Sequence, residues 1–146
     1  MADGKTHEYY GRGALAASFA IASQTTIPLW PFTMGQLIAL YIASPDVDTR
    51  SNSTRRWGIL EFIWTPLQSV TKHRGITHNP IIGPFVVIGY LAAIAVVALH
   101  VLTWIVGGQW TISITFSDAA AFMGGVTLQY WVHLFLDFAS SQRRRG

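Results

Sequence analysis

The clearest candidate for a membrane span, residues 79–106, sets the strongest limit on how this chain can fold. Its 28 residues contain no Lys, Arg, Asp or Glu, and about 20 apolar residues are enough for a helix to cross a bilayer. Asn79 can cap the start of this helix, and Pro80 suits its first position. A second predicted span covers residues 118–139, with Asp118 near its start. We therefore expect an all-α membrane protein.

The first third of the chain holds another uncharged stretch, residues 13–44, which is too long for one ordinary span. Pro28 and Pro31 lie near its middle, and proline interrupts helices. We expect two helices, about 13–29 and 33–44, joined by a tight turn. A single broken helix is the alternative.

The composition supports a membrane protein with one domain, residues 1–146. Hydrophobic residues make up 51% of the chain and charged residues 12%, about half the charged share of a soluble protein. The chain has no cysteine, which excludes disulfides and thiolate metal ligands. Its basic residues flank the apolar stretches, so membrane lipids explain them better than nucleic acid, and no nucleic-acid partner is expected.

Four spans place every basic residue on one side of the membrane. Two Lys or Arg residues precede the first span, five lie between the second and third, and three follow the fourth, while the two opposite loops have none. Basic loops stay in the cytoplasm. The asymmetry predicts a multi-pass protein of the cytoplasmic (inner) membrane with both termini inside.

Residues 54–70, between the second and third spans, predict an amphipathic helix at the membrane interface. Their apolar residues recur at intervals of three and four, as a helix with one apolar face requires. Pro66 should kink or end this helix. The apolar positions are Trp57, Leu60, Ile63, Trp64 and Leu67.

Histidines and carboxylates gather at the same, cytoplasmic ends of the spans. His133 and Asp137 are four residues apart and share one face of the last helix, and ionisable groups within a membrane tend to mark function. Imidazole and carboxylate without thiolate suit Zn, Mn or Fe, held as one ion or as two bridged ions. The candidate metal ligands are His7, Asp46, Asp48, His73, His78, His133 and Asp137.

Two further features of this face indicate a phosphate-containing ligand. The helix that starts at Asn79 can present free N–H groups to an anion, and Arg74 can add bidentate hydrogen bonds. Asp46, Asp48 or His73, if not bound to metal, could act as a general base. We take Asp48 and His73 as the catalytic candidates, and Arg74 and Asn79 as the residues that bind the ligand.

The order of these motifs resembles a known family. Gly-x-Thr-His at 4–7, Asp-x-Asp at 46–48, His-Arg-Gly-x-Thr-His at 73–78 and His-x-x-x-Asp at 133–137 resemble the YdjM-like predicted membrane-bound metal-dependent hydrolases. The run 77–83 is similar to a related group of metal-binding membrane proteins. This resemblance implies the same seven metal ligands, although Asn79 stands where many relatives have Ser or Gly.

Two functions are consistent with these observations. The first is a metal-dependent hydrolase that uses an activated water on a phosphate ester or an amphiphilic, lipid-like phosphate at the cytoplasmic interface. The second is a non-catalytic accessory subunit of a larger membrane complex, with a structural metal and with small residues around Gly124 and Gly125 packed on partner helices. Metal transport is disfavoured, because the outer half of the spans offers only His100 and Asp118 as ligands.

Overall fold

The computed structural model describes residues 4–72, 75–108, 111 and 113–142, and every regular element within these ranges is helical. The all-α prediction is confirmed. Within the same ranges the α-helices are α1 (Gly4–Ala22), α2 (Leu29–Tyr41), α3 (Asn52–Arg55), α4 (Thr65–Val70), α5 (Ile82–Val106) and α6 (Phe116–Gln142). The 3-10 helices there are η1 (Pro45–Asp48), η2 (Gly58–Trp64) and η3 (Ile76–His78).

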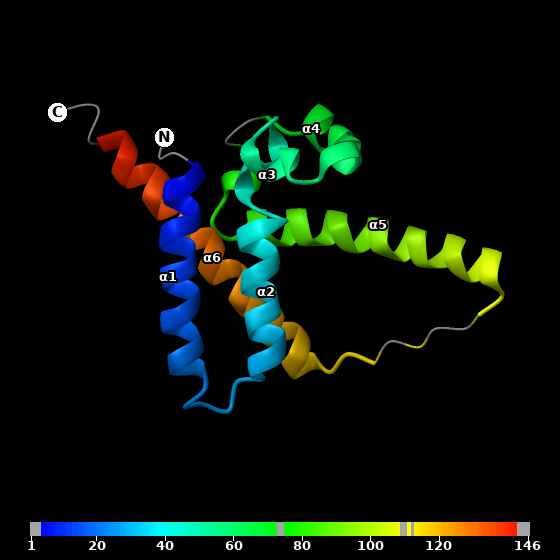
Figure 1. Cartoon of the computed structure of the whole chain (residues 1–146), viewed down its shortest axis with the longest axis horizontal. Helices are drawn as coiled ribbons and strands as arrows, with labels where there is room; N and C mark the ends of the chain where they lie inside the picture. The colour runs from blue at the N-terminus through cyan, green and yellow to red at the C-terminus, as the bar shows by residue number, and fades with distance from the viewer. Residues whose placement is uncertain (1–3, 73–74, 109–110, 112, 143–146) are drawn as a thin grey trace.

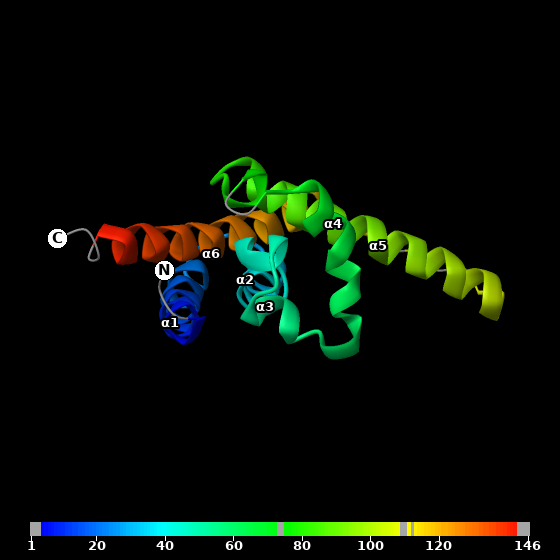
Figure 2. The ribbon, with the colours of Figure 1, turned by 90° about the horizontal axis from the view of Figure 1, so that it is seen from above.

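Three helices form the body of the molecule. Helices α1 and α2 make an antiparallel hairpin, and α6 packs against both (Figure 1). Seen from above, α1 and α2 lie on the same side of α6 (Figure 2). The start of α1, the end of α6 and the short helices α3 and α4 all lie at one end of this body, which brings the histidine and carboxylate motifs together.

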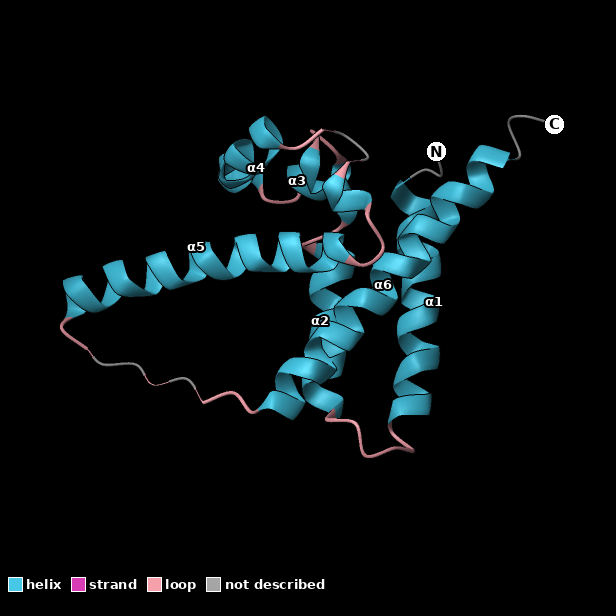
Figure 3. Ribbon diagram, turned by 180° about the vertical axis from the view of Figure 1, so that it is seen from behind, coloured by secondary structure: helices cyan, strands magenta, loops and turns pink. Residues whose placement is uncertain are grey.

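Helix α5 departs from this body. It runs across the direction of α1 and α2, and its far end extends away from α1, α2 and α6 (Figure 3). Only 6% of the residues in its most apolar stretch are buried. The buried residues of this helix, Gly83, Pro84 and Val87, lie in its first two turns.

The first apolar third forms two separate helices, with different boundaries from those predicted. Helix α2 begins at Leu29 rather than at residue 33, with Pro28 as its N-cap. Pro31 lies in the first turn, where its missing N–H would have no partner within the helix anyway, so this proline does not break the helix. Helix α1 starts at Gly4 and therefore includes His7.

The predicted amphipathic helix over residues 54–70 is not continuous. Gly58 has a φ of 56°, a left-handed conformation that interrupts the helix after α3. Pro66 lies in the first turn of α4, near its start rather than its end. Trp64 and Leu67 are 0% and 5% exposed and pack in the core, whereas Leu60 is 45% exposed. The predicted apolar face is thus divided between the core and the surface.

Four transmembrane helices are not confirmed. By length and composition, two helices of the described ranges could cross a membrane, Ile82–Val106 and Phe116–Gln142, which alone is weak evidence for a membrane protein. Helix α1 carries Lys5, Glu8 and Arg12. Helix α2 has 13 residues, which rise roughly 20 Å against a hydrocarbon core of about 30 Å.

Glycines let α2 and α6 approach to backbone contact. A Cβ atom added to Gly35 would lie 2.1 Å from the carbonyl oxygen of Phe122, and one added to Gly125 would lie 2.1 Å from that of Phe32. Neither distance is possible for a real side chain. The small residues at this position therefore hold two helices of the same chain together.

A buried polar network ties α1 to this helix pair. Gln36 of α2 accepts a hydrogen bond from Ser18 of α1 (2.8 Å) and a longer one from Gln129 of α6 (3.3 Å). The Gln129 amide also donates to the carbonyl of Gly11 in α1 (3.0 Å). These bonds fix how α1 sits beside α6, and thus where His7 lies.

Candidate metal centre

Four of the predicted ligands converge from three elements that are far apart in sequence. Asp46 comes from η1, His78 from η3, and His133 and Asp137 from α6. Each offers one nitrogen or carboxylate oxygen, and these four atoms all lie within 4.8 Å of one another. The His133–Asp137 spacing of one helical turn directs both side chains to the same point.

Asp46 lies between the two histidines of this group. Its Oδ1 is 3.3 Å from Nε2 of His78, and its Oδ2 is 3.4 Å from Nε2 of His133. Nε2 of His133 is also 3.9 Å from Oδ2 of Asp137. All four side chains are largely buried, with 8–18% of their surfaces exposed.

Asp48 lies beside this group and orients one of its members. Its carboxylate is buried and accepts a hydrogen bond from the hydroxyl of Thr77 at 2.7 Å. The same oxygen is 3.6 Å from Nδ1 of His78. Asp48 thus faces one side of the His78 ring while Asp46 faces the other, which fixes the ring's orientation.

His7 brings the N-terminal helix to the centre. Its Nε2 is 3.2 Å from Oδ1 of Asp137, and its ring stacks on that of His133 with 4.0 Å between centroids. His7 therefore holds one oxygen of Asp137, and the other oxygen of that carboxylate is the one that faces His133.

The charges of the centre stabilise one another. Burial would raise the pKa of Asp46, but the adjacent imidazoles of His133 and His78 outweigh it and hold this pKa far below its usual range. Burial would likewise lower the pKa of His78, but Asp46 and Asp48 raise it to about 9. Without a metal, a proton on His78 thus supplies positive charge between the two carboxylates.

The residues present fit a divalent cation. Among the described residues, the buried atoms Oδ1 of Asp46 and Nε2 of His133 have no hydrogen-bond partner, although both are good metal ligands. Donors about 2.1 Å from a tetrahedral ion lie roughly 3.4 Å apart, close to the 3.3 and 3.4 Å measured around Asp46. Two imidazoles with two carboxylates suit Zn, Mn or Fe.

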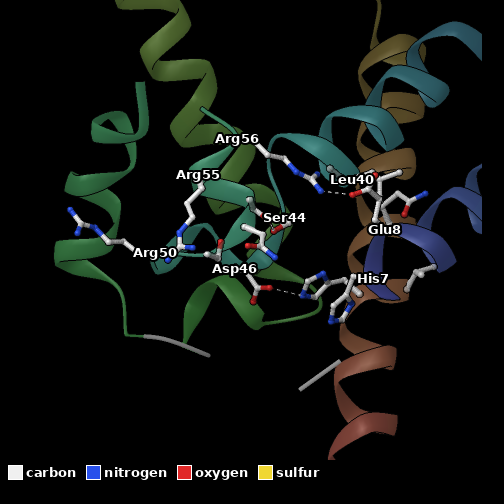
Figure 4. Close-up of a pocket in the computed structure, with 15 residues that line it drawn as sticks. His7, Glu8, Leu40, Ser44, Asp46, Arg50, Arg55 and Arg56 are labelled. Carbon is white, nitrogen blue, oxygen red and sulfur yellow. Dashed lines mark hydrogen bonds and ion pairs between the residues drawn. The ribbon is translucent and has the colours of Figure 1, made fainter. Parts of the chain in front are cut away.

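A cavity of about 260 Å³ opens onto this centre. Asp46, His133 and His7 are among the residues that line it, and Figure 4 labels Asp46 and His7 at this cavity. The other walls carry Glu8 and the side chains of the segment after η1. The centre is therefore reachable by a small molecule, although its ligands are largely buried.

Among the described residues, Asn79 does not join the four-residue group. Asn79 is exposed, and its Oδ1 accepts hydrogen bonds from the N–H groups of Ile81 and Ile82, both at 2.9 Å. It thereby occupies the donors that were expected to bind an anion. His73 and Arg74 lie outside the described residues.

Sequence reasoning missed residues that become functional only through the fold. Thr77 stands between two histidines of a motif, yet its hydroxyl is what holds Asp48. Arg55 and Arg56 belong to the segment expected to lie flat on the membrane, yet they line the cavity. The signal that could have located the arginines is their closeness in sequence to Asp46 and Asp48.

Replacing Thr77 with Val is expected to weaken metal binding about tenfold or more. The change removes the hydroxyl that holds Asp48, the residue that orients the metal ligand His78. The Asp48 carboxylate would remain buried but lose its hydrogen bond from the Thr77 hydroxyl. Thr71→Val is the matched control, since the Thr71 hydroxyl donates to the backbone oxygen of Leu67. Competition with a metal chelator measures both affinities, and equal values for the two variants would contradict this role of Thr77.

The stability of the metal-free protein is expected to fall as pH rises toward 9. The pKa of His78 is raised from 6.5 to about 9 in the folded protein. Its stabilisation is therefore complete below pH 6.5 and is lost as pH rises through 9. A metal needs the neutral imidazole, so the gain in Tm on adding metal should grow over this same window. Thermal unfolding with and without metal measures the trend, and a gain that does not change with pH would contradict it.

Part of the chain is similar to a known protein. An uncharacterized protein of Aquifex aeolicus (strain VF5) is 42% identical over 62 residues, a match that covers 42% of this chain and 44% of that relative. The chain thus spans less than half of that relative's length. No solved structure matches the chain significantly.

The family model described as "Uncharacterized metal-binding protein (DUF2227)" matches residues 2–146. This match agrees with the metal-binding part of the resemblance found in the sequence, and it says nothing of hydrolysis. The matched range includes every element that contributes to the centre. The chain belongs to this family of metal-binding proteins.

Proposed function

We propose that the chain is a membrane-embedded, metal-dependent hydrolase that acts on a phosphate ester or a lipid-like phosphate. The observation that carries this proposal is the cavity of about 260 Å³ that opens onto Asp46 and His133. Structural metal sites are closed by protein ligands, whereas catalytic sites keep a position open for water and substrate. A divalent ion at this centre would lower the pKa of a water and neutralise charge on the ester.

The protein residues have separate tasks in this proposal. Asp46, His78, His133 and Asp137 would hold the ion. With four protein ligands, the hydrolase requires a further coordination position on the cavity side for water. His7 orients Asp137, and Asp48 with Thr77 orients His78. Asp48 is 3% exposed and engaged with Thr77, so of the two predicted catalytic residues His73 is the preferred general base and Asp48 a positioning residue.

A membrane location is part of the proposal and follows from the surface of α5. This helix has no charged residue, and beyond its first turns most of its apolar side chains are exposed. A contiguous apolar surface of this kind favours contact with lipid or a partner over contact with water. The one-sided distribution of Lys and Arg supports four crossings, with the metal centre at the cytoplasmic face. In the structure, α5 runs across the direction of α1 and α2. If all four helices cross the membrane side by side, α5 has to rotate relative to α1 and α2 about the segment that precedes Ile82.

Single-cysteine labelling tests this topology directly, because the chain has no cysteine of its own. In sealed vesicles, cysteines placed at Gln24 and Gly108 are expected to react with an impermeant reagent from the outer side. A cysteine at Ser53 should react only from the inner side. If Gly108 reacts from the same side as Ser53, α5 does not cross the membrane.

Hydrolysis is tested with the purified full chain loaded with Zn, Mn or Fe. We expect metal-dependent release of phosphate from a phosphatidic acid in mixed micelles. Asp46→Asn should abolish the release, whereas Glu61→Gln, which removes a carboxylate outside the metal centre, should retain it. Metal-loaded protein that releases no phosphate from lipid or soluble phosphate esters would contradict the proposal.

The exposed surface of α5 also favours the second candidate, an accessory subunit of a larger membrane complex. Helices of a partner could cover α5 in place of lipid. The small residues first considered for such contacts do not add support, because Gly125 packs on Phe32 of the same chain. Stable co-purification of a larger complex, with no hydrolysis by the metal-loaded protein, would favour this candidate.

A further inference from the structure

The cavity beside the metal centre has a strongly basic wall. Arg50, Arg55 and Arg56 line it, against the carboxylates of Glu8 and Asp46. Asp46 is also the residue whose charge a bound divalent ion would neutralise. With a metal in place, the cavity therefore carries an excess of positive charge and calls for an anionic ligand.

The three arginines differ in what they can bind. The Arg50 side chain is 86% exposed and points away from Asp46 and His7 (Figure 4). Arg56 bonds Glu8 and is 38% exposed. Within the described part of the chain, Arg55 makes no ion pair or side-chain hydrogen bond, which leaves its five N–H donors available.

Glu8 holds Arg56 in its place at the cavity. Its two carboxylate oxygens bond Arg56 from the segment after α3 and Arg12 from its own helix. Arg12 is fixed in turn by the hydroxyl of Tyr41 at 3.0 Å. The Arg56 side chain is thus held in a fixed position at the cavity. The side chain of the neighbouring Arg55 is able to reorient and donate hydrogen bonds to a ligand.

We propose that Arg55, supported by Arg56, forms the subsite that binds the phosphate group of the substrate next to the metal centre. This inference rests on the proposed function and gives its substrate a defined contact. Guanidinium groups bind phosphate through paired, charge-assisted hydrogen bonds. The phosphate can belong to a lipid headgroup or to a soluble phosphate ester.

Phosphate binding to the full chain in detergent tests the subsite, with inorganic phosphate as the soluble probe and phosphatidic acid in mixed micelles as the lipid probe. The variants are Arg55→Gln and Arg56→Gln. Lys72→Gln is the control, since Lys72 is exposed and does not line the cavity. Metal content and thermal unfolding confirm that each variant is folded and loaded.

We expect Arg55→Gln to weaken phosphate binding about tenfold or more, and Lys72→Gln to weaken it less than about twofold. If Arg55→Gln weakens the binding of both inorganic phosphate and phosphatidic acid, the subsite recognises the phosphate group itself, in a soluble or a lipid ester. If it weakens only the binding of phosphatidic acid in micelles, the ligand is a lipid headgroup. Equal binding by Arg55→Gln and Lys72→Gln, or no phosphate binding by the loaded wild-type protein, would overturn the subsite.

Failure of this inference is distinguishable from failure of the proposed function. If wild-type protein hydrolyses a phosphate ester and Arg55→Gln does so with an unchanged KM, only the subsite is wrong. If phosphate binds in an Arg55-dependent way and no ester is hydrolysed, the subsite stands and the hydrolase does not.

Discussion

Asp46→Asn is expected to lower the affinity for a divalent metal at least about a hundredfold, more than loss of a residue that only orients a ligand. Asp46 is the residue that links the two histidines, with 3.3 Å to His78 and 3.4 Å to His133. Asparagine keeps the shape of the side chain but removes its negative charge and one of its two acceptor oxygens. Elemental analysis after dialysis against a chelator measures the metal that each protein retains.

Glu61→Gln is the matched control for this change. It removes one carboxylate from the same end of the molecule, and the Glu61 side chain contacts Thr54 and Arg50 rather than the metal centre. We expect this variant to retain as much metal as the wild-type protein. Equal retention by Asp46→Asn and wild type would show that the metal lies elsewhere.

The second large effect concerns the fold. Gly125→Ala is expected to lower the free energy of unfolding by at least about 3 kcal/mol, the upper part of the range for an overpacked core. The added methyl group would meet the backbone of α2 at 2.1 Å, and a backbone cannot rotate away as a side chain can. Because α6 carries His133 and Asp137, a shift of this helix should also weaken metal binding.

Gly89→Ala provides the comparison, since no atom lies within 4 Å of a Cβ added there. Alanine is favoured over glycine within a helix, so this variant should keep or raise stability by about 0.5–1 kcal/mol. Thermal unfolding in detergent measures both variants. A Gly125→Ala protein as stable as Gly89→Ala would contradict the close packing of α2 on α6.

Much of the centre could be predicted from sequence because its signals are local. Residues 133–137 form one helical turn with His and Asp on the same face, and the motifs of 46–48 and 73–78 adjoin helix ends. The distribution of Lys and Arg predicts that these ends share one side. The structure brings Asp46, His78, His133 and Asp137 together at that side.

Other features depend on tertiary structure and could not be read locally. The periodicity of residues 54–70 predicts one helix, but the left-handed Gly58 divides the segment and the core takes Trp64. The positions of Arg55 and Arg56 at the cavity depend on this interruption of the helix at Gly58. The roles of Asp48 and Asn79 also depend on their contacts, one with Thr77 and the other with the start of α5.

The charge asymmetry illustrates the same limit in another way. The distribution of Lys and Arg indicates which residues lie on the same side of the membrane. It contains no information on the angles between the helices. The orientation of α5 across α1 and α2 therefore has no counterpart in the sequence pattern (Figure 1). An apolar helix gives the same signal whether it lies along its neighbours or extends from them.

Asp46, His78, His133 and Asp137 are expected to bind a divalent metal together. X-ray absorption spectroscopy of the purified full chain tests this expectation most directly. We expect a bound metal with only nitrogen and oxygen donors near 2.0–2.2 Å and the scattering pattern of two imidazole rings. A protein that carries no metal, or a metal whose spectrum lacks imidazole scattering, would contradict the claim.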